Sequence, residues 1–89
     1  MEYIFKFKLT DVYPRIVDSL GTKEVAVSSI VKTEEDKLLF QGNIRVRFNE
    51  FGIFPDARDI AKAAEETTIR KQLTFELKRY VKPHRKFLV

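Results

Sequence analysis

The residues best placed to do chemistry in this sequence are cations that alternate with apolar residues in two short segments. Lys6 and Lys8 lie two apart in one segment, and Arg45 and Arg47 lie two apart in the other. If both segments are strands, period-two alternation places each pair on one face of a sheet. Four cations on one face repel one another unless carboxylates or a bound anion lie between them. Cations in this pattern are typical of contacts to phosphate groups, although a solvated face explains the same pattern.

A second basic cluster lies in the C-terminal segment. Residues 70–89 carry seven basic residues against Glu76 alone, a net charge of +6, whereas the whole chain carries +4. The remaining residues therefore sum to −2, and the basic character belongs to this segment. Basic clusters attract polyanions or acidic protein surfaces. The candidate nucleic-acid-binding residues from both clusters are Lys6, Lys8, Arg45, Arg47, Lys78, Arg79, Lys82, Arg85 and Lys86.

Side chains suited to catalysis or metal binding are few. The chain has no Cys and a single His, His84, which excludes thiol nucleophiles, zinc–thiolate sites and sites that need two imidazoles. Asp56 and Asp59 lie at the start of an expected helix, where carboxylates usually cap the first turn. The three glycines are too scattered for a phosphate-binding loop. We therefore expect a protein that is not an enzyme and that holds no metal and no cofactor.

The length and composition fit one small folded domain. The chain has 89 residues, of which 44% are hydrophobic and 34% are charged. No apolar run approaches the roughly 20 residues that span a bilayer, and Glu2, Lys6 and Lys8 interrupt the N-terminal segment, unlike a signal peptide. We expect a cytoplasmic protein without membrane contact, with a single domain over residues 1–82 and a basic tail over residues 83–89.

The elements that position these cations in the N-terminal half are mainly strands. Apolar and polar residues alternate from Tyr3 to Thr10, β-branched residues are frequent from Lys23 to Thr33, and the alternation is cleanest from Leu38 to Phe48. Pro14 and Gly21 frame a short helix. The patterns predict a strand at 3–10, a helix at 15–20, and a hairpin of strands 23–33 and 38–48 joined by a polar turn at 34–37. Within the hairpin, Gly42 indicates a bulge or the close approach of another backbone.

The C-terminal half allows two interpretations. Residues 51–55 are expected to form a loop whose apolar side chains tuck under the sheet, and a helix is expected from Asp56 to about Glu66. Ile60 and Ile69 would fall on opposite sides of one continuous helix, so we infer a break between them. Residues 67–82 then form either a strand or a second helix, and Pro83 ends the element in both cases.

Each interpretation of residues 67–82 leaves one residue misplaced. A strand directs Leu73, Phe75, Leu77 and Val81 inward but misplaces Arg79. A helix directs Ile69, Leu73, Leu77 and Tyr80 inward but misplaces Phe75. We favour the strand, because Thr74 and Phe75 prefer sheets and a fourth strand completes a common topology.

The predicted fold is α+β, with a sheet of three to four strands and helices on one face. The strand interpretation gives the ferredoxin-like order β-α-β-β-α-β, in which the first and third strands are adjacent, and the alternative is β-α-β-β-α with a helical C-terminus. The first order resembles that of the RNA-recognition motif, which presents aromatic residues outward on its third strand. Here those positions hold Asn43, Arg45 and Arg47. The resemblance therefore covers element order, and contacts to phosphates are expected rather than base stacking.

The most favoured function is a small binding module that contacts the phosphate backbone of nucleic acid through the basic sheet face and the basic C-terminal segment. The alternative is an adaptor or inhibitor, such as those encoded by phages and mobile elements, that binds a nucleic-acid-processing enzyme or another protein with an acidic surface. Its contact surface would be the open sheet face around Ile4 and Leu39, or the loop 51–54. A homodimer through the open sheet face is a third alternative.

Overall fold

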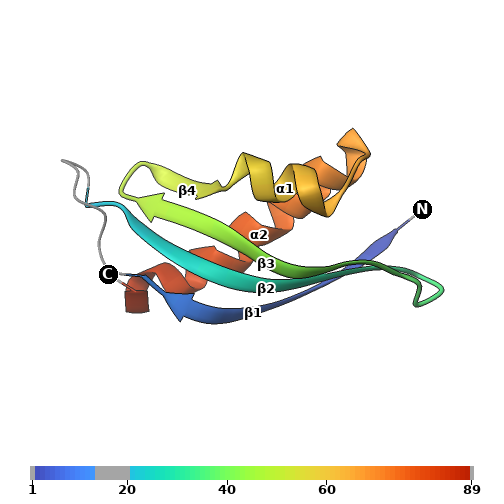
Figure 1. The fold of residues 1–89 in the computed structure, drawn as a ribbon. Helices are drawn as coiled ribbons and strands as arrows, with labels where there is room; N and C mark the ends of the chain where they lie inside the picture. Colours follow the sequence, from blue (N-terminus) through green and yellow to red (C-terminus); the bar gives the residue numbers. More distant parts are fainter. Residues whose placement is uncertain (1, 14–20, 89) are drawn as a thin grey trace.

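The computed structural model describes residues 2–13 and 21–88, with the backbone alone for residues 85–88. Four strands form one antiparallel sheet in the order β1-β2-β3-β4, and two helices follow the strands in the chain (Figure 1). The elements are β1 (Tyr3–Val12), β2 (Lys23–Thr33), β3 (Leu38–Asn49), β4 (Gly52–Pro55), α1 (Ala57–Ala63) and α2 (Thr67–Leu88).

The α+β class is confirmed, but the sheet is a meander in which each strand pairs with the next in the chain. The described residues therefore do not follow the ferredoxin-like order, and β1 and β3 are separated by β2 instead of lying side by side. The helix predicted at 15–20 lies outside the described residues.

The predicted hairpin between β2 and β3 is confirmed. In the turn, the Thr33 N–H donates to the Lys37 carbonyl over 2.9 Å, and the Asp36 N–H donates to the Thr33 carbonyl over 3.0 Å. Asp36 has a φ of 68°, a left-handed conformation that Asp tolerates better than most residues. A bulge between Val31 and Lys32 then shifts the register by one residue along the rest of the two longest strands.

Residues 52–55 form the fourth strand and not the predicted loop. β4 pairs antiparallel with the end of β3, with Asn49 opposite Gly52 and Phe48 opposite Ile53. Only Ile53 of this segment is buried, whereas Phe51 and Phe54 are exposed and do not tuck under the sheet. Four residues that begin with Gly and end with Pro are too few to show the alternation by which strands are identified.

Residues 67–88 form one helix, so the strand interpretation of this segment was wrong. Ile69, Leu73, Leu77 and Val81 follow a four-residue spacing and are all buried, while Phe75 is 60% exposed. The helix prevails because this stripe covers the apolar face of the sheet, which outweighs the weak local preference of Thr74 and Phe75 for strands.

Pro83 does not end the element, because α2 continues through it to Leu88. The proline removes one main-chain hydrogen bond, but its fixed φ is compatible with a helix. The Tyr80 ring lies 4.9 Å from the His84 ring on the next turn. The helix thus includes residues 83–88, where a separate basic tail was expected.

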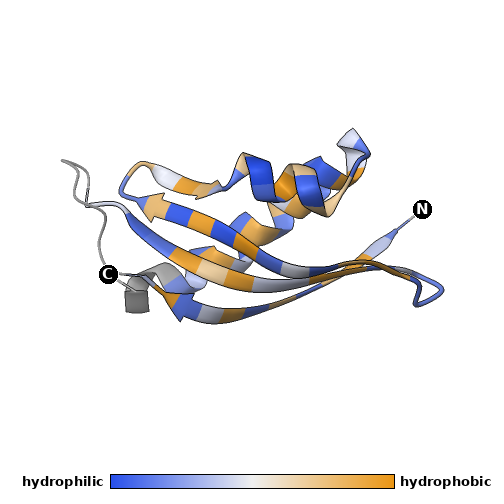
Figure 2. Cartoon of the chain, viewed as in Figure 1, coloured by the Kyte–Doolittle hydropathy of each residue, from blue (hydrophilic) through white to orange (hydrophobic). Residues whose placement is uncertain are grey.

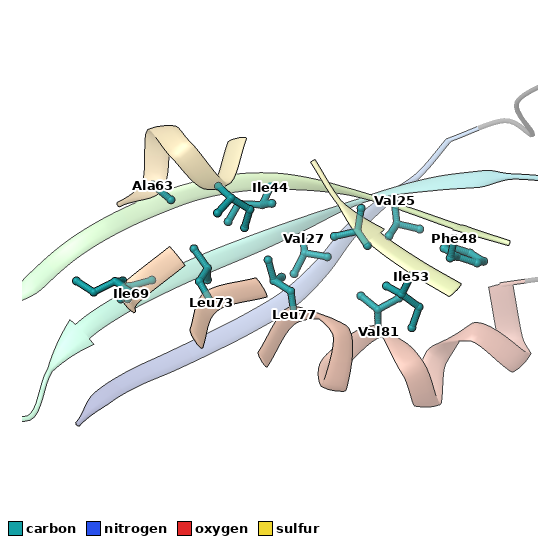
Figure 3. Close-up of a cluster of buried hydrophobic side chains, with 13 residues drawn as sticks. Val25, Val27, Ile44, Phe48, Ile53, Ala63, Ile69, Leu73, Leu77 and Val81 are labelled. Carbon is teal, nitrogen blue, oxygen red and sulfur yellow. The ribbon is translucent and has the colours of Figure 1, made fainter. Parts of the chain in front are cut away.

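The core lies between the sheet and the two helices (Figure 3). Its centre is formed by fully buried side chains of β2, β3 and α2, among them Val25, Val27, Ile44, Val46, Leu73, Leu77 and Val81. β1 contributes Tyr3, Phe5, Phe7 and Leu9 at the margin of this core, where they are only partly buried. One face of the sheet is therefore covered by helices and the other remains open.

Two finer predictions concern α1 and Gly42. Asp56 caps α1 as expected, because its Oδ1 accepts from the main-chain N–H groups of Arg58 and Asp59 at 2.9 and 3.0 Å. The helix ends at Ala63 and not near Glu66, and the inferred break before Ile69 is confirmed. At Gly42 the close neighbour is a side chain, because a Cβ there would lie 2.9 Å from Cζ of Phe40.

Candidate nucleic-acid interface

The four strand cations share the open face of the sheet. In the register of β1 with β2 and of β2 with β3, Lys6 and Lys8 lie on the same side as Arg45 and Arg47. Figure 2 shows the alternation of hydrophilic and hydrophobic residues along β3 that produces this sidedness. β2 lies between the two pairs, which separates them by about 10 Å across the sheet, and they are also offset along the strands, because the register sets Lys8 level with Asn43 and not with Arg45.

Arg45 is neutralised by α1. Its Nε lies 3.1 Å from Asp59 Oδ2, its Nη2 lies 3.7 Å from Asp56 Oδ2, and its main-chain N–H donates to Asp59 Oδ2 over 2.9 Å. These hydrogen bonds hold the pKa of Asp59 below its usual range, against the opposing effect of burial. Arg45 therefore has a structural role, since it fastens α1 to the outer edge of β3.

Arg47 is neutralised within the sheet. Its Nε lies 3.0 Å from Glu24 Oε1 on β2, and the two residues are directly opposite in the strand register. An opposite-charge pair across neighbouring strands stabilises the sheet modestly. The carboxylates of Glu24, Asp56 and Asp59 thus reduce the positive charge of the open face, and Lys6 and Lys8 remain without an ion pair among the described residues.

A second basic surface lies on the solvent side of α2. At about 100° per residue, Lys71, Lys78 and Lys82 fall within about 40° of one another, on the side opposite the buried stripe. None of the three forms an ion pair with a described residue. Phe75 lies among them, and the Arg79 guanidinium lies 5.7 Å from the centre of its ring. We call Lys71, Phe75, Lys78, Arg79 and Lys82 the α2 basic face.

Two arginines near the lysines of the α2 basic face already have partners within the chain. Arg79 pairs with Glu76 over 3.2 Å. Arg70 donates from Nε to the Ala64 carbonyl over 2.6 Å, and so it satisfies main-chain acceptors at the end of α1. A shallow groove lies along the same part of α2. Its lining residues are Thr67, Arg70, Lys71, Thr74, Phe75 and Lys78. An exposed aromatic ring between ammonium groups is a surface that a phosphate backbone can approach without displacing any acidic residue.

The nine residues predicted from the sequence do not form one surface. Lys6, Lys8, Arg45 and Arg47 lie on the open sheet face, whereas Lys78, Arg79 and Lys82 lie on the far side of the helix that covers the other face. Arg85 and Lys86 belong to the last turns of α2, and their side chains lie outside the described ones. Lys71 and Phe75 were not among the candidate residues predicted from the sequence. The strand interpretation left them out, because only a helical spacing places them beside Lys78.

Other kinds of site find little support in the described residues. No group of three or more His, Asp or Glu side chains there is arranged to hold a metal ion. No helix within residues 2–13 and 21–88 is long and apolar enough to cross a membrane. No protein-family model, curated protein or solved structure matches the chain.

Proposed function

We propose that this chain is a non-catalytic nucleic-acid-binding domain that contacts phosphate groups with the α2 basic face. The observation that carries this function is the alignment of Lys71, Lys78 and Lys82 on one side of α2, without a carboxylate partner among the described residues. From Lys71 to Lys82 the helix makes eleven steps of about 1.5 Å, so the three lysines extend over about 16 Å. In a duplex this length corresponds to about five phosphates of one strand.

The helix supports this role because it is a rigid platform. Leu73, Leu77 and Val81 on its opposite side are completely buried, so the lysines project from an element that is fixed to the sheet. Like charges held this close repel one another, and binding a polyanion relieves that repulsion while releasing counterions. Positions 85 and 86 continue the same helix one turn beyond Lys82, so we include Arg85 and Lys86 in the proposed interface.

The open sheet face is a weaker candidate for the same role. Arg45 and Arg47 are paired with carboxylates, which a phosphate would have to displace. Lys6 and Lys8 lie on the opposite side of the domain from Lys78 and Lys82, so one duplex cannot contact both pairs. We therefore assign phosphate binding to α2.

The test compares two double variants with the same net charge. Fluorescence anisotropy of a labelled DNA or RNA duplex would be measured with the unmodified chain, with Lys78→Gln/Lys82→Gln, and with Lys6→Gln/Lys8→Gln. Five phosphate contacts, from the three lysines and from positions 85 and 86, predict a slope of log affinity against log salt of about −4.5, and the three contacts that remain in the α2 variant predict about −2.7. The same relation predicts an affinity loss of about 60-fold for the α2 variant at about 0.1 M salt.

The variant of β1 is the matched control and should bind nearly as tightly as the unmodified chain. Equal losses for the two variants would show that only net charge matters, and the assignment to α2 would be wrong. Affinity that does not fall with salt would contradict phosphate binding altogether.

A further inference from the structure

β1 forms one edge of the sheet, and part of that edge is uncovered. The Leu9 N–H donates to the Tyr80 hydroxyl over 3.0 Å, so the main-chain groups of Leu9 point away from β2. Outward and inward directions alternate along an antiparallel strand, and therefore the N–H and C=O groups of Phe5 and Phe7 also point outward. Their N–H groups have no hydrogen-bond partner among the described residues. The edge around Phe5 and Phe7 can accept another strand.

The side chains beside this edge differ between the two faces. On the helix side, Phe5 and Phe7 are partly buried and stack with their ring centres 6.3 Å apart. Next to them is a hollow between β1 and α2, lined by Glu2, Tyr3, Phe5, Gln72, Phe75 and Glu76. On the open face, Lys6 and Lys8 are exposed and form no ion pair with a described residue. A strand placed here would contact aromatic rings on one face and ammonium groups on the other.

We propose that β1 binds an extended segment of a partner protein by antiparallel strand addition, and that this segment alternates apolar with acidic residues. Main-chain hydrogen bonds to Phe5 and Phe7 would supply much of the affinity, and the two lysines would select the acidic side chains. A second copy of this chain fits less well, because pairing Phe5 with Phe7 of the other copy sets Lys6 against Lys6. This surface is separate from the α2 basic face and does not depend on nucleic-acid binding.

The probe is a capped peptide of alternating glutamate and valine, titrated into the ¹⁵N-labelled chain and followed by NMR. With the valines on the helix side, the valine N–H groups point toward β1 and the glutamate N–H groups point away. Binding should shift the amide signals of Phe5 and Phe7 and slow their hydrogen exchange. Methylation of the valine nitrogens should abolish binding, whereas methylation of the glutamate nitrogens should leave most of it.

Charge variants complete the test. Lys6→Gln/Lys8→Gln should lower the affinity for the peptide about three- to tenfold, as expected for the loss of two exposed cross-strand ion pairs. Lys78→Gln/Lys82→Gln should leave the affinity for the peptide unchanged. If the peptide does not shift the β1 amides at millimolar concentration, the lysines only protect the edge against pairing and the inference is wrong. Equal binding of the valine-methylated peptide, or a dimer through β1 in light scattering, would also overturn it.

Discussion

Truncating Leu77 and Phe75 in turn tests the packing of α2, on which both proposed surfaces depend. The Leu77 side chain is fully buried, and Phe75 is 60% exposed although it lies only two residues away. In a strand the two side chains would share one face and both would be buried. In the helix their positions differ by about 200°, so their contributions to stability should differ strongly.

The expected magnitudes follow from burial. Leu77→Ala should reduce the free energy of unfolding by about 2–5 kcal/mol, since it removes buried methyl groups and leaves a cavity. Phe75→Ala removes at most about 80 Å² of buried apolar surface, which lowers the free energy of unfolding by about 2 kcal/mol. The higher helix propensity of Ala raises it again by about 0.5 kcal/mol. Because unfolded chains already bury part of this surface, the net loss should be about 1 kcal/mol.

Urea denaturation followed by circular dichroism would measure both variants. A domain of this size has a total stability of about 4–13 kcal/mol, so Leu77→Ala should shift the midpoint far to lower urea. Lys78→Ala, on the exposed side of the same turn, is the control and should change stability by less than about 0.5 kcal/mol. A loss of about 3–5 kcal/mol for Phe75→Ala, equal to or larger than that for Leu77→Ala, would refute the helical packing.

Two further predictions concern the contacts that hold the edges of the sheet. Asp59→Asn should destabilise the chain at neutral pH by less than Leu77→Ala does, because it removes the carboxylate that accepts from Arg45. Since the pKa of Asp59 is lowered in the folded chain, this contribution is complete above the unfolded pKa of about 3.9 and is lost as the pH falls through the folded pKa. The two chains should therefore converge in stability in acid, and a difference that persists far below that pH would contradict the assignment. Tyr80→Phe should lower the free energy of unfolding by about 0.5–1.5 kcal/mol and speed hydrogen exchange at the Leu9 amide. Unchanged exchange at Leu9 would show that the Tyr80 hydroxyl does not accept from that amide.

The strands of the hairpin could be predicted because their information is local. Alternation and a polar turn define β2 and β3. The register was not predictable in the same way, because a bulge between Val31 and Lys32 shifts the pairing by one residue. Without that bulge Glu24 would lie opposite Val46, and with it Glu24 lies opposite Arg47.

The remaining errors come from contacts between segments distant in the sequence. Residues 67–82 satisfy a strand and a helix almost equally, and the choice is made by the apolar face of the sheet that only α2 covers. The bonds from Arg45 to Asp59 depend on β4 carrying the chain back along β3, and β4 is too short to be identified. The sidedness of the cations on each strand was therefore predictable, but their partners and the grouping of the α2 basic face were not.

The most direct test of the central claim is to map the contact surface on the ¹⁵N-labelled chain. Amide signals would be followed by NMR while a short DNA duplex is added at low salt. Phosphate binding by the α2 basic face predicts saturable shifts centred on Lys71, Phe75, Lys78 and Lys82, with little change at Lys6, Lys8, Arg45 and Arg47. Shifts centred on the strand residues, or no shifts at any duplex concentration, would contradict the assignment.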